Sequence, residues 1–254
     1  MKKSLLFLGM SIILAFSLIG CDRLGFFTKT VEGSGEVVIE KRDLSGFNKI
    51  EANGDFELYV TQLNTGVEVH AESNLMKYIR TYVQDQTLFV EIADTDGTAI
   101  NLMPLEPIRV YVRLVRIRGL SGSGGVFVTT SQLLAEGAEL NIALSRESNG
   151  YINAIRTGTL TVDLSGGSDL RVRDGQVTEQ FITAGDGSIY TADWLKSDTT
   201  EIKLSGGSEA TIWAVDTFQV DLSDGSMAYY YGSPLNLNEV RNTGGSDYIS
   251  RGNR

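Results

Sequence analysis

The sequence predicts an all-β protein: a parallel β-helix, or β-solenoid, of about 20-residue coils that follows a less regular β-rich N-terminal half. Three observations predict this fold class. A short Gly/Ser-rich cluster recurs seven times, apolar and polar residues alternate on both sides of the clusters, and the repeat is too short to hold a strand and a crossover helix. The balance of 42% hydrophobic and 21% charged residues is typical of a folded globular chain.

The first 20 residues have the pattern of a secretion signal. Lys2 and Lys3 precede an apolar run over residues 5–19, which is short for a spanning helix. The run ends at Leu18-Ile19-Gly20-Cys21, which resembles the bacterial lipobox, where cleavage before the cysteine is followed by lipid attachment. We therefore predict a lipoprotein signal peptide over residues 1–20 and a lipidated tether over residues 21–32, with Cys21 as the membrane anchor.

The charge balance limits the possible partners. The whole chain has 32 acidic and 22 basic side chains, and loss of Lys2 and Lys3 with the signal leaves a formal charge of 20 − 32 = −12. Such a chain repels nucleic acid and anionic head groups, so we expect no nucleic-acid partner and attachment through the lipid alone. The expected location is the bacterial cell envelope, at the outer membrane or at the periplasmic face of the inner membrane.

The repeat sets the phase of the predicted solenoid, over residues 118–254. Counted from the last residue of each cluster, positions −6 and −4 before it and +2 and +4 after it are mostly apolar, and their neighbours are mostly polar. These positions should face the core, and odd offsets should face solvent. The clusters step by 24, 20, 20, 20, 18 and 20 residues and end at Gly124, Ser148, Ser168, Ser188, Ser208, Ser226 and Ser246.

The corners between strands carry acidic residues that alternate between two positions from coil to coil. Asp186 and Asp224 lie at −2, whereas the intervening coils carry their acids at +1. The alternation avoids a column of like charges and predicts a two-coil period of about 40 residues. Arg146 and Glu147 stand where glycines are usual, which predicts a less tight corner. The acids at +1 are Asp169, Glu209 and Asp247.

The N-terminal half, residues 33–117, is also β-rich. Strands are predicted over residues 37–40, 56–60, 67–71, 88–92 and 109–112, with one helical turn over 74–80. The apolar phase changes between Val112 and Val115, which predicts a bulge near Leu114. We expect this half to share one elongated core with the solenoid.

Three stretches together resemble a known family. They are Leu44-Ser-Gly-Phe-Asn-Lys-Ile50, Gly54-Asp-Phe-Glu-Leu-Tyr-Val-Thr-Gln62 and the Leu-Ser-Gly-Gly-Ser repeats. Over residues 33–250 the chain resembles the GIN-type auto-transporter adhesin head domain family of bacterial envelope proteins. The resemblance implies a right-handed β-helix and an envelope location, and it supplies no catalytic residues.

The sequence offers no convincing catalytic site. His70, the single histidine, lies opposite Val67, Val69 and Ala71 on a strand, so we expect it on a solvated face. The corner acids with Arg171 and Arg173 are candidates for glycan cleavage, but each acid already has a role in a turn. The four arginines of residues 109–118 are expected to pair with carboxylates. One Cys and one His cannot build a structural zinc site, and no calcium-binding nonapeptide repeats. We predict no enzyme activity, no cofactor and no metal site.

The solenoid phase predicts one candidate binding surface. Trp213, Met227, Tyr229 and Tyr231 occupy odd offsets and should form an outward aromatic cluster. The competing interpretation is that the N-terminal half or residues 232–238 cover them as a second core.

Two functions therefore remain open, and the oligomeric state is not specified. The leading one is a non-enzymatic, lipid-anchored envelope protein, adhesin-like, that contacts a glycan or a protein along this face. The alternative is a structural or assembly role, through self-association or docking of a partner, and a glycan-cleaving β-helix enzyme comes third.

Overall fold

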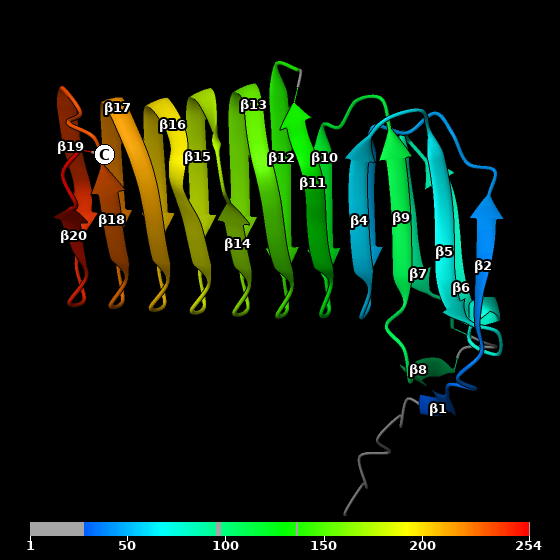
Figure 1. Cartoon of the computed structure of the whole chain (residues 1–254). Helices are drawn as coiled ribbons and strands as arrows, with labels where there is room; N and C mark the ends of the chain where they lie inside the picture. The colour runs from blue at the N-terminus through cyan, green and yellow to red at the C-terminus, as the bar shows by residue number, and fades with distance from the viewer. Residues whose placement is uncertain (1–27, 95–97, 136, 254) are drawn as a thin grey trace, which may run out of the picture.

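The computed structural model describes residues 28–94, 98–135 and 137–253, so the predicted signal peptide and Cys21 lie outside the described residues. Within these ranges the chain forms twenty β-strands and one 3₁₀ helix, η1 (Met76–Tyr78). Eighteen of the strands belong to one sheet, which folds into two facing layers along an elongated rod (Figure 1). No helix of the described residues is long and apolar enough to cross a membrane. The predicted fold class is confirmed.

In the solenoid both layers are built from strands that recur about 20 residues apart, and we call the layers wall A and wall B. The first half of each of β13, β16 and β17 lies in wall B and the second half in wall A. Wall A runs in the order β6 (Ile79–Gln84), β7 (Thr87–Ile92), β3 (Lys49–Asn53), β10 (Gly119–Ser123), β12 (Glu139–Ser145), β13 (Asn149–Leu164), β15 (Gly175–Ala184), β16 (Ile189–Leu204), β17 (Glu209–Leu222) and β19 (Asn236–Asn242). Wall B runs β2 (Val37–Arg42), β5 (Gly66–Glu72), β9 (Arg109–Leu114), β4 (Glu57–Gln62), β11 (Phe127–Ala135), β13, β14 (Asp169–Val172), β16, β17, β18 (Met227–Tyr231) and β20 (Asp247–Ser250).

The core consists of aliphatic columns between the walls. In one column of wall A, residues of successive coils pair in register and are all buried: Ile142, Val162, Ile182, Ile202 and Val220. From the corner that ends at Ser148 to the corner that ends at Ser226, the inward positions predicted from the repeat are buried, except Tyr230, which is half-buried. In the last coil the rule fails, because Val240 is 59% exposed and Tyr248 is half-buried. One continuous cluster of buried residues runs from Phe47 to Ala228, so the N-terminal half shares the core of the solenoid.

The corners are tight turns in which two successive residues have positive φ. Gly166 and Gly167 take φ of 61° and 71°, and Arg146 and Glu147 take 52° and 62°. The prediction of a less tight corner at Arg146-Glu147 is therefore wrong, because these residues adopt the left-handed conformation that glycine favours. At three of these corners the serine after the turn is buried and its hydroxyl donates to the backbone carbonyl three residues earlier, at 2.7–2.8 Å: Ser148, Ser168 and Ser226.

The two-coil period of the corners has a steric cause in addition to the predicted electrostatic one. A Cβ on Gly206 would lie 3.0 Å from the backbone nitrogen of Asp186, and one on Gly244 would lie 2.7 Å from that of Asp224. Two neighbouring coils therefore have too little room to carry a side chain at this corner position in both of them. Asp adopts the left-handed conformation more readily than most residues do, which explains why Asp186 and Asp224 occupy this position in the alternate coils.

The N-terminal half closes one end of the rod with antiparallel strands. β5 pairs antiparallel with β2 and β9, and β6 pairs antiparallel with β7. All five predicted strands are present, and η1 forms the predicted helical turn. The bulge predicted near Leu114 is wrong: β9 ends there, and residues 115–118 cross to wall A, with Val115 67% exposed. Part of the predicted tether, Thr28–Glu32, forms β1, which pairs with β8 (Ala99–Met103) in a separate small sheet.

The other end of the rod is the open last coil, β19 and β20. Its register shifts at Val240, where Val220 pairs with Glu239 and Asp221 pairs with Arg241. Glu239 thus continues the aliphatic column that ends at Val220. The Tyr248 hydroxyl bonds to Glu239, which raises the pKa of Tyr248. A bulge and an inward carboxylate are features that disfavour edge-to-edge pairing of sheets.

Candidate functional site

The predicted cluster lies on the outer side of wall B, near the open end of the rod. Trp213 and Tyr231 are direct neighbours in register on β17 and β18, and Thr211 pairs with Tyr229 one row away. Trp213, Met227, Tyr229 and Tyr231 are each partly exposed. The N-terminal half stands at the opposite end of the rod and does not cover them (Figure 1). Gly232 lies against the edge of the Trp213 ring, where a Cβ would be 3.1 Å away.

A second tryptophan, which the repeat phase does not predict, completes the cluster. Trp194 is 51% exposed and packs edge-on against Trp213, with ring centroids 6.2 Å apart. The rule of even offsets would place Trp194 inside, at +6. Instead the register with β17 shifts between Thr191 and Lys196, so two successive side chains, Asp193 and Trp194, are accessible. The sequence signal was the step of 18 residues between Ser208 and Ser226.

Two cations lie over the rings of this cluster. Lys196 Nζ is 4.7 Å from the ring centroid of Trp213, and Arg251 Cζ is 4.2 Å from that of Tyr229. Each contact contributes about 0.5–1 kcal/mol at an exposed site and limits the motion of the ring. Trp194 remains the most exposed of the four rings. We call the set Trp194, Trp213, Tyr229 and Tyr231, with Met227, Lys196 and Arg251, the aromatic surface.

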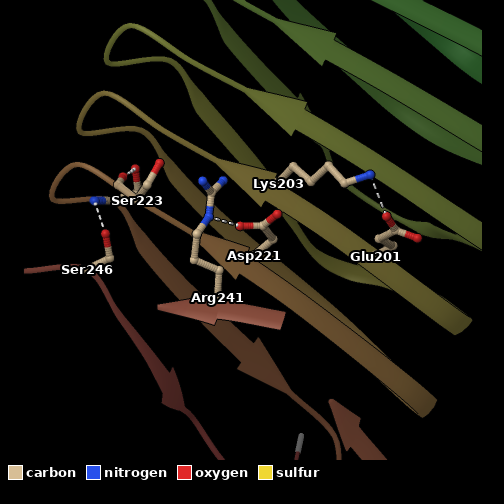
Figure 2. Close-up of polar contacts among 7 residues, drawn as sticks. Glu201, Lys203, Asp221, Ser223, Arg241 and Ser246 are labelled. Carbon is tan, nitrogen blue, oxygen red and sulfur yellow. Dashed lines mark hydrogen bonds and ion pairs between the residues drawn. The ribbon is translucent and has the colours of Figure 1, made fainter. Parts of the chain in front are cut away.

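The outer side of wall A has a different character toward the same end. Figure 2 shows two ion pairs there, Lys203 Nζ to Glu201 Oε1 at 2.8 Å and Arg241 Nε to Asp221 Oδ1 at 2.6 Å. The hydroxyl of Ser246 accepts from the backbone N–H of Ser226 at 3.0 Å, which links the last two corners (Figure 2). The charged side chains on this face are paired with each other. The outer side of wall A therefore carries ion pairs toward this end, whereas that of wall B carries aromatic rings.

A hollow of about 550 Å³ lies on wall A where the N-terminal half meets the solenoid. Its floor is made of small side chains such as Ser121 and Ala143, between the carboxylates of Glu51 and Asp163. Arg146 borders it and donates to Ser123 Oγ at 2.7 Å. The lining of this open hollow mixes charged, hydroxyl and aliphatic side chains and contains no aromatic ring.

His70 and the arginines of β9 form part of a packed array on wall B. His70 was expected on a solvated face. It lies on the outer side of the wall but is half-buried, with its ring centroid 4.5 Å from that of Tyr111. Arg109 pairs with Glu57 at 3.0 Å, which raises the pKa of Arg109, and Arg113 pairs with Glu68 at 3.1 Å. The prediction of ion pairing is confirmed for these two arginines.

The described ranges hold no group of three or more His, Cys, Asp or Glu that could bind a metal ion. Among the corner acids, burial raises the pKa of Asp169, and the nearby charge of Arg171 opposes that shift. The corner acids are spread along the rod, one per coil, because each belongs to a separate turn.

Comparison with solved structures supports the fold. The chain is similar to a putative adhesin from Bacteroides fragilis, with 20% identity, a TM-score of 0.77, and coverage of 86% of this chain and 99% of that one. A putative adhesin from Parabacteroides merdae has 17% identity and a TM-score of 0.67, covering 87% and 98%. A structure from Parabacteroides distasonis described as a putative lipid binding protein has 15% identity and a TM-score of 0.71, covering 87% and 100%.

A search of curated proteins gave no match. Residues 46–234 match the family described as "Putative auto-transporter adhesin, head GIN domain", which is most of the chain and includes all but the last corner of the repeat array. This match supports a non-enzymatic, adhesin-like role and an envelope or cell-surface location. The chain belongs to the putative auto-transporter adhesin, head GIN domain family.

Proposed function

We propose that this protein is anchored in the bacterial envelope through lipid on Cys21 and contacts a glycan through the aromatic surface, without catalysing a reaction. The observation that carries the proposal is the set of four neighbouring rings, two of them under cations, on one side of an acidic rod. Exposed aromatic clusters of this kind are uncommon on monomeric surfaces without a binding role.

The chemistry of the aromatic surface suits a sugar. A pyranose ring has an apolar C–H face that packs on an aromatic ring, and a rim of hydroxyls that accept and donate hydrogen bonds. Trp194 offers the most accessible ring, and Lys196 and Arg251 supply donors beside the other rings. The contact would be broad and shallow, as expected for recognition of a chain at a surface.

The test is a binding screen of residues 22–254 against neutral and acidic polysaccharides and peptidoglycan fragments. We expect Trp194→Ala and Trp213→Ala to weaken binding of any hit about tenfold or more, which corresponds to roughly 1.4 kcal/mol. Phe127→Ala is the matched control, because Phe127 is 42% exposed on wall B but lies on β11, far from the cluster. Equal binding by all three variants would reject the aromatic surface as the site.

A structural role is the second candidate, and the open last coil favours it. Leu235 is 83% exposed there, and β19 and β20 each pair on one side only among the described strands. A docked partner would cover this end, and Leu235→Ser would then abolish complex formation while Trp194→Ala would not. Cross-linking of the envelope complex in both variants distinguishes the two functions.

A further inference from the structure

Four large apolar side chains are exposed where the chain enters the fold. Val37 and Ile39 lie on β2, and Met103 and Leu105 lie at and after the end of β8. Exposed fractions are 42% for Val37, 61% for Ile39, 53% for Met103 and 72% for Leu105. We call these four residues the entry cluster. The exposure of four large apolar side chains at one end of the rod calls for a partner.

The entry cluster is held rigidly to the first strand. Glu72 is buried and accepts hydrogen bonds from the backbone N–H of Gly35 at 2.6 Å and of Leu105 at 2.6 Å. The N–H of Gly33 donates to the Met103 carbonyl at 2.9 Å, and Val37 is the register partner of Glu72. Residues 33–35, which follow β1, and the loop that carries Leu105 are therefore held together as one rigid unit.

The length of the chain before β1 limits where this body can lie. β1 begins at Thr28, so six residues, 22–27, separate it from Cys21. Seven peptide steps span at most about 25 Å when fully extended. If Cys21 carries lipid in the membrane, the end of the rod that holds β1 and the entry cluster must stay close to the bilayer surface.

We propose that the entry cluster inserts into the interfacial layer of the membrane that holds lipidated Cys21, an inference that rests on the proposed lipid anchor. The partner is the bilayer itself, because four exposed apolar side chains lie within reach of the anchor. The acidic charge of the chain rules out a contact driven by anionic head groups, so the contact is hydrophobic.

This contact would set the orientation of the whole protein. Nine strand-to-strand steps separate β2 from β18 along wall B, which is about 43 Å at 4.8 Å per step. With the entry cluster at the bilayer, the aromatic surface stands at the far end of the rod. The fold then acts as a spacer that presents the rings away from the membrane.

The test places one fluorophore at each end of the full-length lipidated protein in phosphatidylcholine vesicles. Cys21 is the only native cysteine, and its thiol carries the lipid, so Leu105→Cys or Leu235→Cys gives a single labelling site for an environment-sensitive dye. Both leucines are highly exposed, at 72% and 83%, so the two variants are matched. Met103→Cys provides a second position in the entry cluster.

We expect the dye at residues 105 and 103 to brighten several-fold and to be quenched by spin-labelled lipid, and the dye at residue 235 to remain unchanged. If the protein floats with vesicles but no dye is quenched, or if all are quenched alike, the proposed contact is wrong and the lipid anchor stands. If the protein does not float with vesicles, the lipid anchor fails instead.

Discussion

The two ends of the rod are protected from edge-to-edge strand pairing in different ways. At the N-terminal end, antiparallel strands β2, β5 and β6 close the sheets, and Glu72 fastens the incoming chain. At the C-terminal end the parallel coils simply stop, and a bulge at Val240 with Glu239 in the aliphatic column blunts the last strands. A solenoid end needs protection from edge-to-edge strand pairing. This protein has an antiparallel cap at its N-terminal end and a bulge with a carboxylate at its C-terminal end.

The largest expected effect comes from disturbing the free end at Gly232. A Cβ there would lie 2.0 Å from the carbonyl oxygen of Ala214, and φ is +97°. Gly232→Ala should therefore lower the free energy of unfolding by roughly 3 kcal/mol, measured by urea denaturation. Gly245→Ala is the control, because its φ is +76° but its Cβ would meet nothing within 4 Å, and it should cost about 1–2 kcal/mol. Equal losses would show that the close approach to Ala214 is unimportant.

Removing the polar protection of the free end should change its association. Glu239→Val would extend the column of Ile202 and Val220 by one aliphatic residue on an exposed edge. We expect the variant to self-associate more than the wild type in sedimentation velocity, at matched concentration. Glu209→Val makes the same change in charge on the outer row of wall B and should leave association nearly unchanged. Association by neither variant would mean that the bulge alone protects the edge.

At the N-terminal end, acid should release residues 33–35 from Glu72 before the solenoid unfolds. Hydrogen bonds from the backbone amides of Gly35, Glu106 and Leu105 lower the pKa of Glu72. Stability from this group is present above its unfolded pKa of about 4.3 and is lost as pH falls through the lower folded pKa. Amide exchange at Gly35 and Leu105, corrected for intrinsic rates, should accelerate over that window. In Glu72→Gln exchange should be fast already at neutral pH, and a slow, pH-independent rate would contradict this role.

The smallest expected effect is on the ion pairs of wall A. Arg241 is 53% exposed beside Asp221, and exposed pairs contribute only about 0.2–1 kcal/mol. Arg241→Ala should lower the unfolding free energy within that range, and added salt should reduce the difference further. A loss above about 2 kcal/mol would mean that this pair takes part in closing the free end.

Much of the fold could be predicted because a solenoid repeats its signal. The alternation around each cluster placed Leu170, Val172 and Ile212 inside, and they are buried. The corner at Arg146-Glu147 could not be predicted, because backbone φ depends on the stacked neighbours and not on local preference alone. The steric reason for alternating Asp186 with Gly206 likewise becomes visible only when the coils are stacked.

The candidate site was predicted in part. Trp213 and Tyr231 follow the outward phase and are neighbours. Trp194 was missed because a register shift of the long strand β16 against β17 reverses the phase, and Lys196 was missed with it. Arg251 had the right offset, +5 from Ser246, but its contact with Tyr229 depends on side-chain packing.

The most direct test of the central claim is tryptophan protection by a bound glycan. Trp213→Phe leaves Trp194 as the only indole, 51% exposed in the free protein. Acrylamide should quench its emission strongly, and saturation with a glycan from the screen should reduce that quenching severalfold. Unchanged quenching at saturation would show that the ligand binds elsewhere and would contradict the assignment of the aromatic surface as the site of contact.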